Sequence, residues 1–169
     1  TIGVTAEIFV YYLVNSFGQA SMTFTGQNYG AGNYERIRKG YRLTLGIAGS
    51  IGLGAGILFF VLNHEIFGLF VNEPEAIEAG GNYLKILALS QLFMVTESVT
   101  AGAFNGTGHT TPPALTGIIF TGARIPMAYF LTSFPQLGLT GIWWSITISS
   151  ILKGSVLPLW FLHFQRKLK

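Results

Sequence analysis

The chain has 169 residues, of which 50% are hydrophobic, 14% are aromatic and only 10% are charged, and its mean hydropathy is +0.49. An ordinary soluble domain carries about 25% charged residues, so this composition excludes a typical soluble domain and indicates an integral membrane protein. The net charge of +3 does not indicate a nucleic-acid partner, because the basic residues cluster at the ends of apolar segments instead of along one face.

The composition also argues against catalytic and metal-binding chemistry. The chain contains no cysteine, which removes disulfides, thiolate metal ligands and cysteine nucleophiles. It has no aspartate, and its three histidines lie near the ends of segments, far apart in sequence. We therefore expect no enzyme activity, no metal site and no cofactor.

The beginning of the chain is apolar, without an initiator methionine or the charged region of a signal peptide. We expect the chain to be a piece of a longer polypeptide. Because a helix needs about 20 apolar residues to cross the core of a bilayer, there is room for about five crossings. The predicted fold class is an all-α integral membrane protein, with transmembrane helices at about residues 1–26, 43–62, 79–104, 114–134 and 139–164.

The first predicted helix carries a polar stripe. Polar side chains recur there at four-residue spacing, which places them on one face of a helix. They are Glu7, Tyr11, Asn15 and Gln19. This face is predicted to contact protein or water instead of lipid.

The second predicted helix is rich in glycine and follows a polar loop and a basic stretch. Glycine-rich turns can bind phosphate, but here the glycines lie inside about 20 apolar residues with no strand before them. Pairs such as Gly52 and Gly56 instead predict close packing of helices. The connection that follows, residues 63–78, is acidic and contains neither Lys nor Arg.

The third predicted helix carries a single acid, Glu97, in an apolar run. An ionisable side chain at membrane depth costs about 2.5–3.5 kcal/mol on insertion scales, so it usually faces a bundle interior or a cavity. Small and polar residues share its helical face. They are Ser90, Met94, Ser98, Ala101 and Asn105.

The last two predicted helices each carry one basic residue, Arg124 and Lys153. Both are costly inside a bilayer, so each is expected to pair with an acid or to extend towards the interface. The acids available for such pairing are Glu7 and Glu97. Pro126, which closely follows Arg124, predicts a local kink.

The basic residues also predict the orientation of the chain. Five alternating crossings place seven of the ten Lys and Arg residues, and the C-terminus, on one side of the membrane. The other side receives the acidic connection. Because positive charge is enriched in cytoplasmic loops, we predict that the C-terminus is cytoplasmic.

Three motifs occur in order along the chain. Residues 26–36 read GQNYGAGNYER, residues 102–110 read GAFNGTGHT, and residues 124–129 read RIPMAY. They resemble motifs of the multidrug and toxic compound extrusion (MATE) family, although Asn105 and His109 stand where the family usually has Arg and often Asp. The resemblance implies twelve helices in two six-helix lobes, with this chain similar to helices eight to twelve. The N-terminal lobe of the same polypeptide would then be a partner.

The function that the resemblance implies is a secondary active antiporter in a cell membrane, here the inner membrane of a bacterium. It would export organic cations, drugs or other amphipathic compounds, driven by an H⁺ or Na⁺ gradient. The alternatives are a flippase for lipid-linked saccharides of the same superfamily and a non-transporting membrane scaffold. A flippase would need a larger and more cationic cavity, for which only Arg124 and Lys153 could supply charge.

Glu97 is the leading candidate for binding the coupling ion or the substrate, because a carboxylate in such a place can exchange a proton for a cation. The further candidates for this role are Glu7, Asn15, Gln19 and Arg124. Aromatic faces bind cations well, and the candidates for a cavity wall are Tyr11, Met94 and Tyr129. For all of them, contacts between helices or with lipid are the alternative role.

Overall fold

The computed structural model describes the backbone of residues 2–168, together with the side chains of residue 8 and residues 10–168. Over that range every regular element is a helix, so the predicted all-α class is confirmed. The helices are α1 (Ile2–Gly30), α2 (Tyr34–Val61), α3 (Asn63–Gly68), α4 (Pro74–Ala88), α5 (Gln91–Gly106), α6 (Thr111–Gly122), α7 (Arg124–Thr132) and α8 (Thr140–Lys167).

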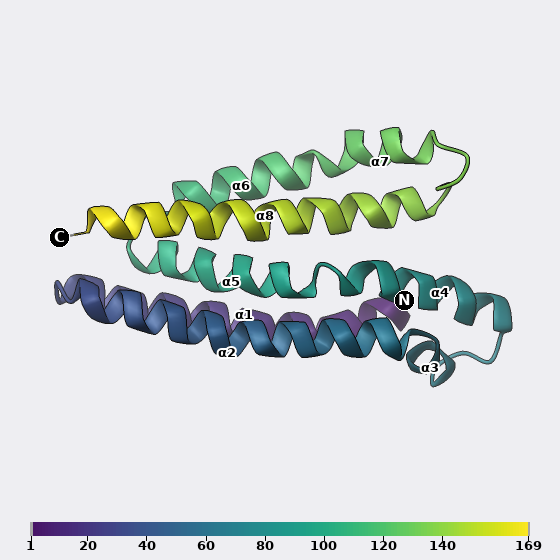
Figure 1. Cartoon of the computed structure of the whole chain (residues 1–169), viewed down its shortest axis with the longest axis horizontal. Coiled ribbons are helices and arrows are strands. Elements are labelled where there is room, and N and C mark those ends of the chain that lie inside the picture. Colours follow the sequence, from purple (N-terminus) through teal and green to yellow (C-terminus); the bar gives the residue numbers. More distant parts are fainter. Residues whose placement is uncertain (1, 169) are drawn as a thin grey trace.

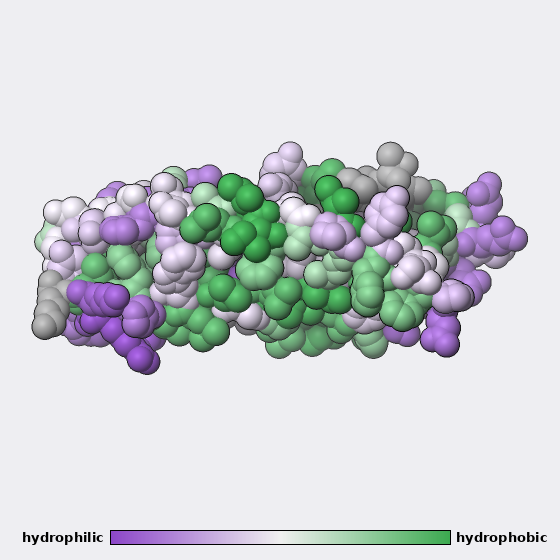
Figure 2. All heavy atoms as spheres, turned by 90° about the horizontal axis from the view of Figure 1, so that it is seen from above, coloured by the Kyte–Doolittle hydropathy of each residue, from purple (hydrophilic) through white to green (hydrophobic). Residues whose placement is uncertain are grey.

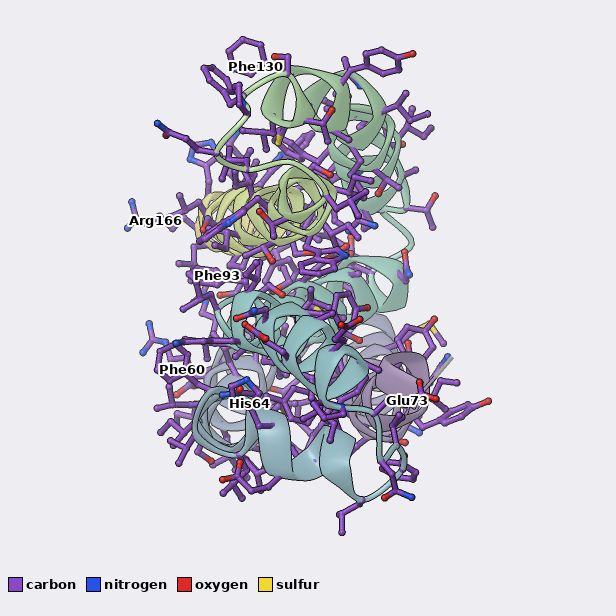
Figure 3. All side chains as sticks on the ribbon, turned by 90° about the vertical axis from the view of Figure 1, so that its right-hand side faces the viewer. Phe60, His64, Glu73, Phe93, Phe130 and Arg166 are labelled. Atoms are coloured by element: carbon purple, nitrogen blue, oxygen red, sulfur yellow. The ribbon has the colours of Figure 1, made fainter. Side chains whose placement is uncertain are left out.

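The long helices run along one axis and are stacked in layers (Figure 1). α1 and α2 form one outer layer, α4 and α5 lie next to them, α8 follows, and α6 with α7 forms the opposite outer layer. The end-on view shows the same order, with Phe130 of α7 at one edge and His64 of α3 towards the other (Figure 3). α5 contacts α1, α2 and α8 and is therefore the central helix.

Apolar side chains cover the outside of the middle of the bundle. Figure 2 shows hydrophobic residues over the middle of one face and hydrophilic residues at its ends. Leu43 and Ile118, for example, are 65% and 73% exposed. Such a surface would be unfavourable in water and is favourable in lipid.

The number of helices that qualify as membrane spans is smaller than predicted. In the described residues, α2, α8 and the stretch Thr111–Thr132 are long and apolar enough to cross a bilayer. The bent pair α4–α5 is a fourth span when it is counted as one. α1 is not among them, since the polar residues along its stripe lower its hydropathy.

The predicted third helix is divided into α4 and α5, which are bent by 49°. Ser90 lies at the break, and its hydroxyl and its backbone N–H both donate to the carbonyl of Leu87, at 2.8 and 2.9 Å. Local side-chain bonds of this kind compete with the helical pattern. The apolar pattern of the sequence runs on through this point, so it does not reveal the bend.

The predicted fourth helix is divided into α6 and α7 at Ala123, close to the expected kink. Proline has no N–H, and its ring clashes with the carbonyl four residues upstream. For Pro126 that residue is Gly122, where α6 ends. Pro158, in contrast, lies inside α8 without ending it.

The second helix begins earlier than predicted, at Tyr34 instead of residue 43, because the basic stretch is itself helical. Arg38 in this first part of α2 donates from Nη2 to the carbonyls of Gln165 (3.1 Å) and Leu168 (2.6 Å). Carbonyls at a helix C-terminus lack helical partners and favour a nearby cation. The start of α2 and the end of α8 are therefore joined at one end of the bundle.

Glycines let α5 approach its neighbours closely. A Cβ on Gly102 would collide with the carbonyl of Gly18 in α1, and a Cβ on Gly52 would collide with the side chain of Val95 in α5. A Cβ on Gly56 would lie 2.9 Å from a carbonyl of α4, so the predicted packing role of Gly52 and Gly56 is confirmed. These contacts fix α1, α2 and α5 against one another.

Candidate functional site

A cavity of about 470 Å³ lies where α1 and α5 meet α7 and α8. Volumes of this size suit small-molecule ligands. The lining residues include Tyr11, Asn15, Gln19 and Met22 from α1, Met94, Glu97, Ser98, Ala101 and Asn105 from α5, and Arg124, Ser150 and Lys153 from the opposite wall. Tyr11 is 54% exposed, so the cavity is open at the surface of the chain.

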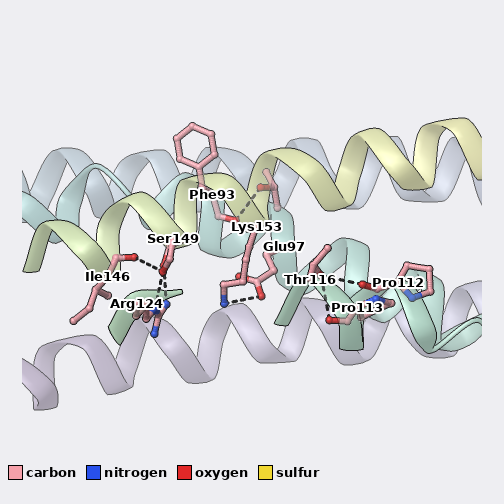
Figure 4. Close-up of polar contacts among 11 residues, drawn as sticks. Phe93, Glu97, Pro112, Pro113, Thr116, Arg124, Ile146, Ser149 and Lys153 are labelled. Atoms are coloured by element: carbon pink, nitrogen blue, oxygen red, sulfur yellow. Dashed lines mark hydrogen bonds and ion pairs between the residues drawn. The ribbon is translucent and has the colours of Figure 1, made fainter. Parts of the chain in front are cut away.

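Glu97 and Lys153 form an ion pair at this cavity (Figure 4). Nζ of Lys153 lies 3.0 Å from Oε1 of Glu97, and the two side chains are 12% and 25% exposed, respectively. The expectation that Lys153 pairs with an acid is thus confirmed, and the acid is Glu97. Each charge offsets the cost of placing the other in an apolar bundle.

The backbones of α5 and α8 are in direct contact beside the ion pair. The hydroxyl of Thr96, next to Glu97, lies 2.9 Å from the carbonyls of both Phe93 and Gly154. A Cβ on Gly154 would collide with the backbone of Phe93. Because Gly154 directly follows Lys153, the starting point of the lysine side chain is fixed relative to the carboxylate.

Arg124, the second cation of the cavity, is held by hydroxyl groups. It donates from Nε to Oγ of Ser149 at 2.5 Å and from Nη2 to Oγ of Ser150 at 3.2 Å (Figure 4). The hydroxyl of Ser149 donates to the carbonyl of Ile146 at 2.9 Å and so presents its lone pairs to the guanidinium. The described residues contain no carboxylate within 4.0 Å of Arg124, so Arg124 bonds to this serine pair and not to Glu97. An ion pair with Glu7 stays a prediction.

The remaining predicted site residues fall into three groups. Tyr11, Asn15, Gln19 and Met94 line the cavity, and Nδ2 of Asn15 donates to the carbonyl of Tyr11 at 2.9 Å within α1. Tyr129 is 83% exposed on α7 and does not line this cavity. The side chain of Glu7 lies outside the described residues. Binding or coupling by any of these residues stays a prediction.

The two serines that hold Arg124, Ser149 and Ser150, were not predicted from the sequence. They precede Lys153 by four and three residues, a spacing that puts all three on one face of α8. This spacing was therefore a usable signal. Hydroxyl residues within apolar helices are common at helix contacts, however, and the pattern alone does not connect them with Arg124 on another helix.

The apolar exterior, the helices long enough to cross a bilayer and the charged cavity between them define a multi-pass α-helical membrane protein with an internal polar site. The sequence profile of the MatE family matches residues 1–130. The chain therefore belongs to the MatE family, the family that its motifs resemble.

Individual relatives agree with this assignment. The chain is 31% identical over 166 residues to the probable multidrug resistance protein NorM of Thermotoga maritima, which covers 95% of this chain and 35% of the relative. Among solved structures, a multidrug resistance MATE family transporter of the MOP superfamily matches in its inward-facing conformation with a TM-score of 0.87, at 20% identity, over 98% of this chain and 39% of that one. An outward-facing conformation of such a transporter matches with a TM-score of 0.81, at 22% identity, over 99% and 39%.

The chain is much shorter than the proteins that it matches. The chain spans only about 35% of the NorM relative and 39% of the two transporter chains. The likeness to the solved structures, at 20% and 22% identity, concerns the fold alone.

Proposed function

We propose that the chain is part of a secondary active antiporter that exports organic cations, drugs or other amphipathic compounds. The observation that carries this proposal is the Glu97–Lys153 ion pair at a cavity of about 470 Å³, in a chain of the MatE family. The name of the Thermotoga maritima relative, a probable multidrug resistance protein, supports the same function. Among the described residues that line the cavity, Glu97 is the sole carboxylate.

Glu97 would exchange the coupling ion for the substrate. When its carboxylate is ionised, it attracts a cationic substrate, and when an ion neutralises it, that attraction is lost. Binding of the two is then mutually exclusive at one group, which is the requirement for antiport. Tyr11 and Met94, which line the same cavity, would contact the flat apolar part of the substrate, since aromatic faces and thioethers suit such groups.

The partner of this part would be the N-terminal lobe of the same polypeptide. The exposed residues at the cavity support this, since Tyr11, at 54% exposure, lies where a second lobe could close the site. The other partners are the lipid bilayer and the small-molecule substrate.

The orientation that we propose has a cytoplasmic C-terminus, in the inner membrane of a bacterium. The contact of Arg38 with the end of α8 supports it, because this contact brings the basic start of α2 and the basic C-terminus to the same end of the bundle. Positive charge gathered at one end is typical of the cytoplasmic side.

The test compares two carboxylate variants of the full-length polypeptide in a bacterial strain that lacks its own drug pumps. Glu97→Gln removes the charge at the cavity, whereas Glu35→Gln removes an exposed charge paired with Lys39 at 2.8 Å. We expect Glu97→Gln to abolish gradient-driven efflux of ethidium, and Glu35→Gln to retain it. Efflux at the wild-type rate by Glu97→Gln, at equal amounts of folded protein, would remove Glu97 from the mechanism.

A flippase for lipid-linked saccharides is a second candidate because two cations, Arg124 and Lys153, line the cavity against one carboxylate. An excess of positive charge would suit the phosphates of such a lipid. Reconstituted liposomes separate the two functions: an antiporter moves ions when a drug is added, and a flippase moves the lipid between leaflets. A scaffold, the remaining alternative, would do neither, and no substrate would protect it from thermal unfolding.

A further inference from the structure

The ammonium of Lys153 lies 3.0 Å from one oxygen of Glu97, so a metal cation would have to share this carboxylate with it. We infer that Lys153 is a tethered counter-ion that keeps Na⁺ away from Glu97, so that H⁺ is the ion that acts at this carboxylate. This inference rests on the proposed antiport function and specifies its coupling ion. It also makes Lys153 a specificity-determining residue of the site.

The counter-ion is held in place by its own helix. The carbonyl of Gly154 lies 2.9 Å from the hydroxyl of Thr96, and Gly154 packs directly on the backbone of Phe93. These contacts flank Lys153 on α8 and Glu97 on α5. The ammonium therefore has a high local concentration at the carboxylate, and a dissolved cation has to compete with a group that cannot diffuse away.

Among the described side chains, the other charged and titratable groups around Glu97 add to this exclusion. α8 contributes Lys153, α7 contributes Arg124, and α1 contributes the phenol of Tyr11. α2 presents the phenol of Tyr41 to α5, bonded to Thr100 at 2.9 Å, and α6 has no titratable residue. A metal ion at Glu97 would meet two cations that line the same cavity, and like charges repel.

A proton and an organic cation can both bind at this site despite the two cations, for different reasons. A hard metal cation is bound by several oxygen ligands at once, whereas a proton forms one O–H bond with a carboxylate oxygen. The proton would come from water on the side to which the cavity is open and leave to water on the other side. While Glu97 is protonated and neutral, Lys153 has lost the charge of its partner. An organic cation gains apolar contacts with Met22 and Met94 and can bind without displacing the ammonium.

The experiment measures binding of rhodamine 6G, a flat organic cation, to the purified full-length polypeptide by fluorescence polarisation. The dissociation constant is compared in NaCl and in choline chloride at equal ionic strength, and as a function of pH. For the wild type we expect the same value in both salts and weaker binding in acid. For Lys153→Met we expect binding about tenfold tighter in choline, the lower end of the coupling found between close charge pairs, and a loss of this gain in NaCl.

Two further variants serve as controls. Lys153→Arg keeps the cation and should resemble the wild type, whereas the double variant Glu97→Gln/Lys153→Met lacks the carboxylate and should bind equally in both salts. Weakening of wild-type binding by Na⁺, or a Lys153→Met variant whose binding is the same in both salts, would overturn the inference.

A transport measurement decides the case if Lys153→Met does not fold. In liposomes, wild-type efflux should follow a pH gradient and not a Na⁺ gradient. Efflux driven by Na⁺ would uphold the antiporter and overturn the role of Lys153. No gradient-driven efflux at all would overturn both.

Discussion

The contact between Gly102 and Gly18 predicts a measurable cost for a single added methyl group. In the substitution Gly102→Ala, the new Cβ would collide with the carbonyl of Gly18 in α1. Overfilling a packed site costs about 1–3 kcal/mol, and the upper half of this range applies because the colliding atom belongs to the backbone and cannot rotate away. Alanine also favours the helix over glycine by about 1 kcal/mol. The net loss of stability is therefore about 1–2 kcal/mol.

The matched control is Gly54→Ala. A Cβ on Gly54 meets nothing within 4 Å. This variant should therefore gain stability from the higher helix propensity of alanine and lose none to a collision. Titration of both variants with SDS, followed by circular dichroism, gives their free energies of unfolding. We expect Gly102→Ala to be the less stable by about 2–3 kcal/mol. Equal stability of the two variants would show that α1 and α5 are not in backbone contact.

Two further predictions concern contacts away from the cavity. Tyr41→Phe removes the hydrogen bond to Thr100 but leaves no unpaired donor, so it should cost about 0.6 kcal/mol, whereas Thr100→Val leaves the buried phenol of Tyr41 without an acceptor and should cost about 1–3 kcal/mol. The same SDS titration tests this order, and a larger cost for Tyr41→Phe would contradict it. Arg38→Gln releases the two carbonyls at the end of α8 and should speed amide hydrogen exchange there without changing dye binding. Unchanged exchange would show that Arg38 does not hold this end.

Much of the fold follows from local patterns in the sequence. Apolar runs give the existence of the long helices, and Pro126 gives the division between α6 and α7. The bend at Ser90 was missed because the hydroxyl bond to the carbonyl of Leu87 that lies there has no signature of its own in the sequence. Ser149 makes the same kind of bond to Ile146 inside the unbroken α8. The early start of α2 was missed for a different reason. Hydropathy shows only the part of a helix that lies in lipid. The first turns of α2, which include Arg38, are helical but too polar to be recognised in this way.

The stripes of the site were also predictable, because they lie within single helices. Glu7 to Gln19 in α1 and Met94 to Asn105 in α5 follow helical spacing, and the structure brings the described members of both stripes to one cavity. Which cation meets which acid was not predictable. That choice depends on how α5 and α8 approach one another, and the approach is set by Gly154, whose small size becomes informative once its contact with Phe93 is known.

The ion pair with Lys153 changes what the burial of Glu97 implies about function. A lone acid in an apolar run suggests function because its burial is costly, at about 2.5–3.5 kcal/mol on insertion scales. With Lys153 at 3.0 Å, the attraction between the two charges offsets part of that cost, so expense alone no longer argues for function. The pair differs from a purely structural ion pair because it lies at an open cavity beside a second cation. In the proposed antiporter, neutralising Glu97 would leave Lys153 and Arg124 lining one cavity with no ionised carboxylate among its described residues, so binding of one proton would weaken the attraction of the site for a cationic substrate.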